Sequence, residues 1–175
     1  MGEVTSITTE MRGLKPPARL NTSHDLSKFD CGKQVLNDWL RNTASGSEGT
    51  TARTYVVCSD NFVVGYYCIS TGSIERKAIP TKFKRQQGIP NQIPVAIIGR
   101  LAVDLSQQGI GLGRDLLSDA LKRVASAAEI IGIRAVLLHA LDEETVPFYI
   151  KHKFQRCPTG DRTFFLPIET IIGSI

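Results

Sequence analysis

A glycine-rich stretch, Gln108-Gly109-Ile110-Gly111-Leu112-Gly113, offers the clearest chemistry in this chain. It follows an apolar, strand-like run and opens an amphipathic helical pattern. Glycines lack the Cβ atoms that would keep a ligand away from the backbone. The first turn of a helix also presents unpaired N–H groups at the positive end of its dipole. This junction therefore predicts a cradle for an anion such as a pyrophosphate.

The glycine-rich stretch has an apolar strand pattern before it and the pair Phe148-Tyr149 after it. With these elements in this order, the chain resembles the GNAT acyltransferase superfamily, whose acetyl-CoA motif reads Gln/Arg-x-x-Gly-x-Gly/Ala. Gln108, Gly111 and Gly113 match that motif position for position. The resemblance implies an α/β fold with a single mixed central β-sheet flanked by helices. It also implies acetyl-CoA as co-substrate.

A second set of segments lies nearer the N-terminus: Phe29-Asp30-Cys31-Gly32, Leu36-Asn37-Asp38-Trp39-Leu40, Ala52-Arg53-Thr54-Tyr55-Val56 and Gly65-Tyr66-Tyr67. In these segments the chain is similar to the GNAT toxins of bacterial toxin–antitoxin pairs. That similarity implies acetylation of the α-amino group of aminoacyl-tRNA, which blocks translation. It further implies neutralisation by a ribbon-helix-helix antitoxin, operator DNA bound through that antitoxin, and a homodimer.

The superfamily resemblance also indicates which residues hold the cofactor. Main-chain atoms of the strand before the glycines would pair with the pantetheine arm, and the cradle would hold the phosphates. Arg114 could face a phosphate of CoA or be an ordinary surface arginine, and Leu101 and Val103 could be core residues as well. The expected cofactor-binding set is Leu101, Ala102, Val103, Gln108, Gly109, Ile110, Gly111, Leu112, Gly113 and Arg114.

Tyr149 is the candidate general acid. A phenol with an ordinary pKa of about 10 is protonated at neutral pH and can donate its proton to a departing CoA thiolate. Spacing alone is equally compatible with Phe148 and Tyr149 as core aromatics, and the family match favours catalysis. The superfamily has a glycine where Lys153 stands, so the corner after this helix is expected to differ.

No general base is evident from the sequence. Glu143, Glu144 and His139 precede the tyrosine, but helix-start charges and a core imidazole explain them equally well. The α-amino group of an aminoacyl ester needs little help, since a free α-amine titrates near about 8 and a lysine near about 10.4. The lack of an obvious base therefore favours an α-amine as acceptor.

Basic residues cluster in an irregular stretch that contains Arg76, Lys77, Lys82, Lys84 and Arg85. This stretch is either a solvated loop or a contact to a phosphate backbone. The toxin resemblance raises the second interpretation to equal standing with the first and adds basic residues nearer the N-terminus. The candidate tRNA-contacting residues are Lys33, Arg41, Arg53, Lys82, Lys84 and Arg85, of which Arg53 is the best placed.

The composition suits one compact domain over residues 1–175, of which 42% are hydrophobic. The net charge of +4 is a mild excess of basic residues. No apolar run long enough to span a membrane and no signal-peptide pattern is present, so a cytoplasmic protein is expected. The four cysteines lack metal-ligand spacing and are expected to be reduced core thiols, with no bound metal: Cys31, Cys58, Cys68 and Cys157.

The secondary structure that must position these residues follows from periodicity and turn residues. We expect a flexible or extended leader over residues 1–17, and a helix after Asp30, capped by that residue. A mobile loop should follow over residues 43–52. The remaining expected elements are a hairpin of 54–58 and 62–71, a short helix at 81–87, strands at 95–103 and 135–141, helices at 112–131 and 143–151, and closing strands at 154–157 and 163–166.

Two other functions remain open at this level. A GNAT enzyme could act on a small-molecule amine or a protein N-terminus, and the basic stretch would then be incidental. Alternatively, the chain could be a regulatory module that binds CoA without turnover. Release of CoA separates the enzymes from the module, and growth arrest on expression separates the toxin from the other enzyme.

Overall fold

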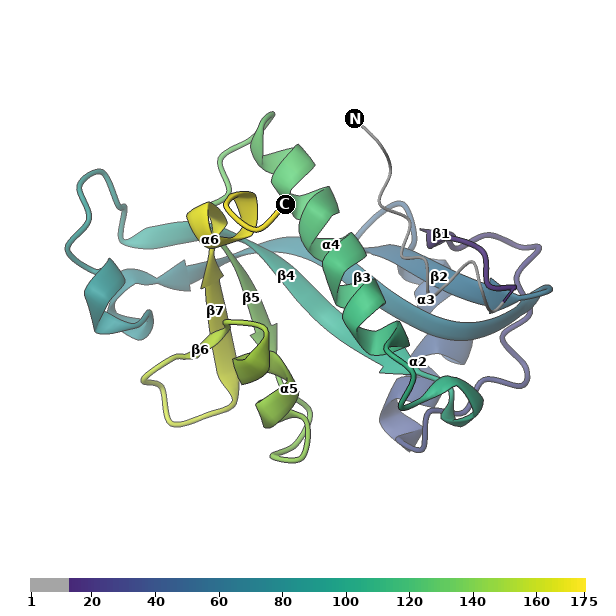
Figure 1. Cartoon of the computed structure of the whole chain (residues 1–175). Coiled ribbons are helices and arrows are strands. Elements are labelled where there is room, and N and C mark those ends of the chain that lie inside the picture. Colours follow the sequence, from purple (N-terminus) through teal and green to yellow (C-terminus); the bar gives the residue numbers. More distant parts are fainter. Residues whose placement is uncertain (1–12) are drawn as a thin grey trace. The chain divides into compact units, whose positions relative to one another are not determined.

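The computed structural model describes residues 13–175, which form two compact units. The first contains residues 13–69 and 100–120, and the second contains residues 70–99 and 121–175. Seven strands form one sheet in the order β1-β2-β3-β4-β5-β7-β6 (Figure 1). Antiparallel and parallel pairs both occur in it, so the mixed sheet expected from the sequence is confirmed.

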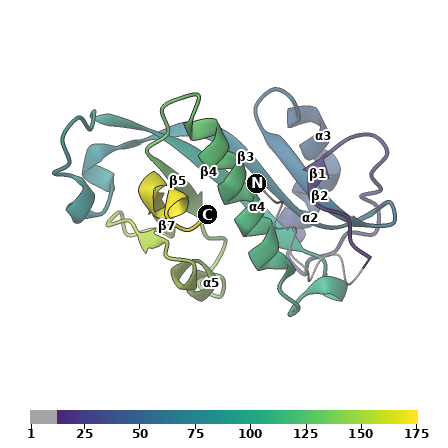
Figure 2. The same ribbon diagram turned by 45° about the horizontal axis from the view of Figure 1, so that its top comes forward.

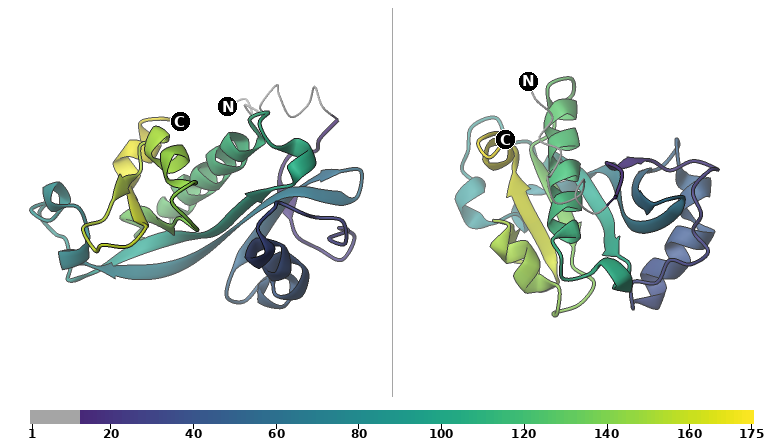
Figure 3. Two further views of the ribbon diagram at one scale, coloured as in Figure 1. Left: turned by 90° about the horizontal axis from the view of Figure 1, so that it is seen from below. Right: turned by 45° about the vertical axis from the view of Figure 1, so that its right-hand side comes forward.

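The first unit is built on a β-hairpin. Strands β2 and β3 are antiparallel and are joined through Asp60, whose φ of 53° makes the tight turn that the sequence predicts. Helices α2 and α3 lie on one face of this hairpin, and the first half of α4 lies on the other (Figure 3). The elements that lie in or enter this unit are β1 (Ala18–Arg19), α2 (Gln34–Asn42), α3 (Ala44–Ser47), β2 (Arg53–Ser59), β3 (Phe62–Glu75), β4 (Gln92–Val103), the 3-10 turn η3 (Leu105–Gln107) and α4 (Leu112–Ala128).

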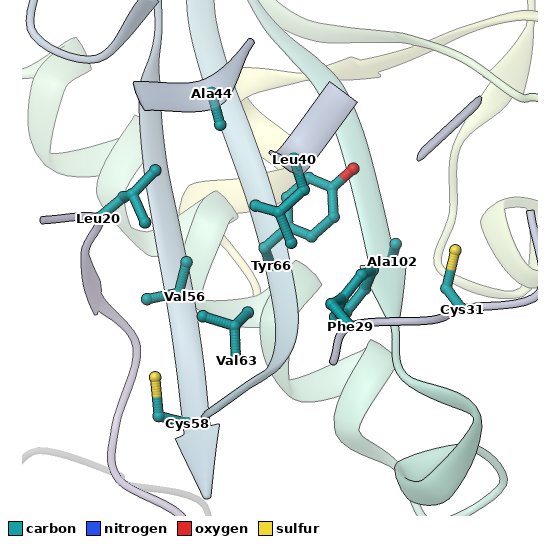
Figure 4. Close-up of a cluster of buried hydrophobic side chains, with 10 residues drawn as sticks. All are labelled: Leu20, Phe29, Cys31, Leu40, Ala44, Val56, Cys58, Val63, Tyr66 and Ala102. Carbon is teal, nitrogen blue, oxygen red and sulfur yellow. The ribbon is translucent and has the colours of Figure 1, made fainter. Parts of the chain in front are cut away.

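Tyr66 is at the centre of the apolar cluster beneath α2 (Figure 4). Its ring stacks on Trp39 at 5.9 Å between centroids and meets the edge of Phe29 at 5.5 Å. The buried hydroxyl donates to the Leu36 carbonyl over 2.8 Å. On the opposite face of β3, a Cβ at Gly65 would lie 3.0 Å from Leu116, so the missing side chain lets α4 pack closely on the strand.

The second unit contains the parallel step that the sequence predicts. Strand β5 (Ala135–His139) runs parallel to β4 from Val95↔Ala135 to Ile98↔Leu138, and β7 (Thr163–Pro167) is antiparallel to β5 (Figure 2). A helical crossover is the usual connection between parallel strands. The other elements of this unit are the 3-10 turns η1 (Arg76–Ala78) and η2 (Thr81–Phe83), α5 (Val146–Lys151), β6 (Gln155–Arg156) and α6 (Ile168–Ile172).

Residues 43–52 correct one expectation. They were expected to form a mobile loop, but they contain the short helix α3, and the Glu48 carboxylate fixes the segment. One carboxylate oxygen of Glu48 accepts from the Arg19 guanidinium at 2.7 Å, and the other accepts from the Thr54 N–H at 2.6 Å. Both partners lie outside the segment, so its small polar residues give no local sign of the order.

Smaller differences concern the ends of elements. Lys33, rather than Asp30, is the N-cap of α2. Helix α4 ends at Ala128 instead of 131, and α5 begins at Val146 instead of 143. Residues 1–12 of the expected leader lie outside the described residues, and Leu14 forms an isolated bridge to Ser59 on β2. Within residues 13–175, no helix is long and apolar enough to cross a membrane.

Candidate active site

The glycine-rich stretch forms the turn between β4 and α4. Gly109 and Gly111 have φ values of 76° and 91°, which L side chains rarely adopt. The intrahelical ladder starts where the Asp115 N–H donates to the Gly111 carbonyl over 3.1 Å. The N–H groups of the first turn, which includes Leu112 and Gly113, have no acceptor within the helix by their position. The backbone of the turn is therefore suited to an anion, as the sequence predicts.

The Gln108 side chain is engaged with the protein itself. Its amide nitrogen donates to the Cys31 carbonyl at 3.0 Å and to the Val103 carbonyl at 2.9 Å. The first of these bonds connects residues 77 positions apart in the chain. Gln108 thus joins the cradle to the Phe29–Gly32 segment, and its side-chain nitrogen is already used within the protein.

Asp104 forms a second connection between the same two segments. One carboxylate oxygen accepts from the N–H and the hydroxyl of Ser106, at 2.9 and 2.7 Å. The other oxygen accepts from the Asp30 N–H at 2.9 Å, and the Asp30 carbonyl accepts from the Leu105 N–H at 2.8 Å. Both the N–H and the carbonyl of Asp30 are therefore hydrogen-bonded to the residues that directly follow β4.

Asp30 is in turn held by α2. Its carboxylate accepts from the Gly32 N–H at 2.8 Å and from the Asn37 amide at 2.9 Å, and these hydrogen bonds lower the pKa of Asp30. The Asn37 side-chain oxygen Oδ1 accepts from the Cys31 N–H at 2.9 Å. Asn37 is one of the few buried polar side chains, at 3% exposure. The Asp-Cys-Gly and Asn positions of the toxin-like segments thus meet in one hydrogen-bonded cluster.

The remaining expected cofactor residues lie in the same unit. Ala102 is buried in the cluster around Tyr66, whereas Leu101 and Val103 alternate with it and are partly exposed. Arg114 is exposed and forms an ion pair with Asp115 at 3.3 Å. Because that ion pair is at the surface, it would cost little to redirect the Arg114 guanidinium to a phosphate.

Tyr149 lies on α5 in the second unit, in an aromatic setting. Its ring contacts Phe148, Phe154 and Phe164 at centroid distances of 5.1, 5.9 and 6.3 Å. Burial raises the pKa of Tyr149 to about 12, so the phenol is protonated at neutral pH. Within residues 13–175 the hydroxyl has no hydrogen-bond partner, and Thr54 Oγ1 is the only fully buried side-chain oxygen or nitrogen without one.

Lys153 stands at the corner after α5, where the superfamily motif has a glycine. Its φ is 70°, the left-handed conformation that favours glycine. The Phe154 N–H donates to the Tyr149 carbonyl at 3.1 Å, and the Lys153 N–H donates to the Ile150 carbonyl at 3.0 Å. This pair of bonds is a Schellman motif. Lys153 therefore closes the helix in a strained, left-handed conformation, and the expected difference from the superfamily's corner stays a prediction.

The candidate bases differ in their surroundings. His139 is exposed at the end of β5 rather than a core imidazole, and its Nδ1 lies 2.7 Å from the Thr163 hydroxyl. Glu143 pairs with Arg156 at 2.9 Å. Glu144 is exposed and engaged in a further interaction. None of these contacts singles out a base, in agreement with the sequence analysis.

The candidate tRNA residues are divided between the units. In the first unit, Lys33 and Arg53 are partly exposed, and the Arg53 guanidinium donates to the Ala52 carbonyl at 3.3 Å. Arg41 donates to the Phe29 carbonyl at 2.5 Å and so stabilises the turn before α2. In the second unit, Lys82 and Arg85 are exposed, and Lys84 is partly buried.

Two members of the basic stretch have structural partners. The Arg76 guanidinium donates to the Lys84 carbonyl at 2.5 and 2.9 Å and holds the excursion together. Lys77 pairs with Glu75 at 2.9 Å. All four cysteines are buried and form no disulfide bond. Within residues 13–175, no three His, Cys, Asp or Glu side chains gather as metal ligands.

Comparisons with known proteins give close sequence relatives, although no protein-family model matches the chain. Over 150 residues it is 39% identical to the tRNA-acetylating toxin of Mycobacterium tuberculosis, and the match covers 85% of this chain and 89% of that protein. It is 37% identical over 158 residues to the probable toxin TacT of Sinorhizobium fredii, covering 85% of this chain and 87% of that one.

Solved structures give the same picture. AtaT complexed with acetyl-methionyl-tRNAfMet superposes with a TM-score of 0.84 and 30% identity, covering 92% of this chain and 98% of that one. An AtaT tyrosine-to-phenylalanine variant, bound to the C-terminus of the antitoxin AtaR and acetyl-CoA, gives 0.78 and 28%, with coverages of 91% and 96%. The KacTA–DNA complex gives 0.76 and 28%, with coverages of 92% and 97%. The fold expected from the sequence is thereby confirmed.

Proposed function

Because the chain belongs to the family of the tRNA-acetylating toxins, we propose that it transfers the acetyl group of acetyl-CoA to the α-amino group of an aminoacyl-tRNA. Acetylation removes the nucleophilic amine that forms the next peptide bond, so translation stops. The observation that carries the proposal is the 39% identity over 85% of the chain.

The cradle and Tyr149 divide the chemistry. The backbone of Gly109–Gly113 holds the CoA phosphates, Arg114 adds a cation, and main-chain atoms of Leu101, Ala102 and Val103 pair with the pantetheine arm. The amine nitrogen attacks the thioester carbon, and the C–S bond breaks as the amide forms. Tyr149 donates its proton to the departing thiolate, the proton released by the amine goes to solvent, and Tyr149 regains a proton from solvent. The raised pKa of Tyr149 keeps that proton in place beforehand.

Binding of the tRNA is assigned to basic side chains on both units. Lys33, Arg53, Lys82, Lys84 and Arg85 would follow the phosphate backbone of the tRNA. Their charge supports this assignment, as do the exposure of Lys82 and Arg85 and the partial exposure of the other three. Arg76 and Lys77 are left out because a carbonyl and a carboxylate already engage them. An α-amine with a low pKa also needs no strong base, which fits the surroundings of His139 and Glu143.

The partners follow from the family. AtaT bound to the C-terminus of the antitoxin AtaR, and KacTA in complex with DNA, are precedents for complexes with an antitoxin and with DNA. We extend this to a ribbon-helix-helix antitoxin that carries this chain to operator DNA, to a homodimer, and to action in the cytoplasm, where charged tRNA is used. We also propose that residues 1–175 act as one catalytic domain, although they form two compact units.

The test measures acetylation of total charged tRNA and of a free aminoacyl-ester analogue at two salt concentrations. We expect the tRNA to be the better acceptor, with an advantage that shrinks as salt rises, because phosphate contacts release condensed counterions. Charge reversal of Lys82, Lys84 and Arg85 together should reduce the tRNA rate alone. Charge reversal of Lys77, which pairs with Glu75, is the matched control.

Equal, salt-independent rates on both acceptors would show that the protein recognises only the amine. The alternative enzyme, an acetyltransferase of small amines or protein N-termini, would then replace the toxin. Binding of acetyl-CoA without release of CoA on any acceptor would indicate the regulatory module.

A further inference from the structure

We propose that Asp30, Asn37 and Asp104 are positioning residues for acetyl-CoA, which set the shape of the cradle without touching the cofactor. The inference deepens the proposed function and rests on it for the identity of the ligand. Helix α2, which is far from the glycine-rich stretch in sequence, would thereby determine how tightly that stretch binds phosphate.

The first step is that the hydrogen bonds are continuous from α2 to the cradle. Asn37 holds the Cys31 N–H and the Asp30 carboxylate. The Asp30 backbone holds Asp104 and Leu105. The Cys31 carbonyl accepts from Gln108, one residue before the first glycine of the cradle.

The second step is that little else fixes the loop. Leu105, Ser106, Gln108 and Gly109 are all exposed, so burial of apolar surface contributes little to their placement. Glycine at two positions widens the choice of backbone conformations further. Beside the Asp104 N–H bond to the Val64 carbonyl at 2.8 Å and the burial of Leu112, hydrogen bonds from the Asp30–Asn37 segment therefore help to select the conformation of the turn.

The third step is that the network starts from a buried residue. At 3% exposure, Asn37 has no water to replace a lost partner, so a change there is transmitted to its neighbours. Asp104 lies at the other end, inside the loop. Its carboxylate adds a negative charge near a site for an anion, which is unfavourable for binding unless its structural role outweighs the repulsion.

That opposition gives a decisive test, which uses calorimetric affinity for acetyl-CoA with the full-length protein. Asp104→Asn removes the charge and keeps the shape, so electrostatics alone predicts tighter binding. We expect weaker binding instead, by about tenfold, because an amide cannot accept from both Ser106 and Asp30. Unchanged or tighter binding in the folded variant would overturn the proposal.

A second pair of variants tests the other end of the network. Asn37→Asp keeps the acceptor for Cys31 but sets a second carboxylate against Asp30, so we expect a similar loss of affinity. The exchange Asp30→Asn with Asn37→Asp restores one donor and one acceptor, and should recover affinity to within about threefold of wild type. Failure of the folded exchange to recover any affinity would contradict the assignment.

Kinetics separate positioning from general damage. In the weakened variants the KM for acetyl-CoA should rise, with kcat at saturating acetyl-CoA and the KM for charged tRNA close to wild type. Asp38→Asn is the matched control, since Asp38 is exposed on the same helix and accepts only from the Gln34 side chain among the bonds described, at 2.6 Å. An equal effect of the control would overturn the proposal. Because affinity is measured without an acceptor, failure of tRNA acetylation would count against the proposed function alone.

Discussion

The cofactor cradle and the Tyr149 corner are stabilised in opposite ways. The cradle is polar and mostly exposed, and hydrogen bonds to residues 74 and 77 positions away hold it. The Tyr149 corner is apolar, with three aromatic rings around the tyrosine and a helix end closed by bonds within six residues. One site is fixed from a distance and the other locally.

The difference follows from the chemistry of each site. An anion is bound by several N–H groups that must converge, so their backbone has to be selected from many conformations. A proton donor needs one hydroxyl in a setting that keeps it neutral, and burial among aromatic rings achieves this by raising its pKa. A change in the cradle should therefore act on cofactor affinity, and a change at Tyr149 should act on the rate.

The largest effect is expected from Gly111→Glu, which should abolish measurable binding of acetyl-CoA. The new side chain brings a negative charge to a phosphate site, and its Cβ would lie 3.3 Å from the Arg114 guanidinium. Calorimetry checks the loss. Gly109→Ala is the control for backbone strain, because its φ is also positive and nothing lies within 4 Å of the added Cβ. Wild-type affinity in Gly111→Glu would show that the phosphates bind elsewhere.

Tyr149→Phe should slow acetyl transfer by about 10² to 10⁴ and keep acetyl-CoA affinity within a few-fold. Turnover at saturating acetyl-CoA measures the effect. Because the pKa of Tyr149 is raised to about 12, the wild-type rate should show no loss from its ionisation below about pH 10.

The comparison for Tyr149 is Tyr55→Phe, which removes a phenol hydroxyl in the first unit, where Tyr55 stacks on Tyr67 at 5.2 Å. That variant should turn over at close to the wild-type rate. Similar rates for wild type and Tyr149→Phe would instead mean that Tyr149 is only a core aromatic residue.

The smallest effect is expected from Lys153→Gly, which should raise the free energy of unfolding by about 0.5–1 kcal/mol. Glycine removes the cost of the left-handed conformation and gives back part of the gain as unfolded-state entropy. Chemical denaturation measures it, and Lys153→Ala, which keeps the strain, should show no gain. If Lys153→Ala and Lys153→Gly raise the free energy of unfolding equally, then loss of the lysine charge, and not relief of backbone strain, causes the increase.

The sequence predicts those parts of the molecule whose causes are local. Periodicity and nearby turn residues predict the β2–β3 hairpin, helix α4 and the parallel strand β5. Helix α3 was missed because its order depends on Glu48, which is held by Arg19 and Thr54 from other segments.

The site divides in the same way. Gly109 and Gly111 reveal the cradle because a positive φ needs a glycine at that very position. The role of the Gln108 side chain was not predictable, since its two acceptors are main-chain carbonyls that any residue could supply. Asp30 and Asn37 lie in segments that resemble the toxin family. Their hydrogen bonds to each other and to the Cys31 N–H are seen only in the structure.

The bonded path from Asn37 to Gln108 has a thermodynamic consequence for anything that docks on residues 29–37. If a macromolecule binds this segment more tightly when the cradle is occupied than when it is empty, then it must raise the affinity for acetyl-CoA by the same factor. A molecule that prefers the empty cradle must lower the affinity for acetyl-CoA by the factor of its own preference. The affinities of such a macromolecule and of acetyl-CoA would thus depend on each other, although the two need not bind to the same surface.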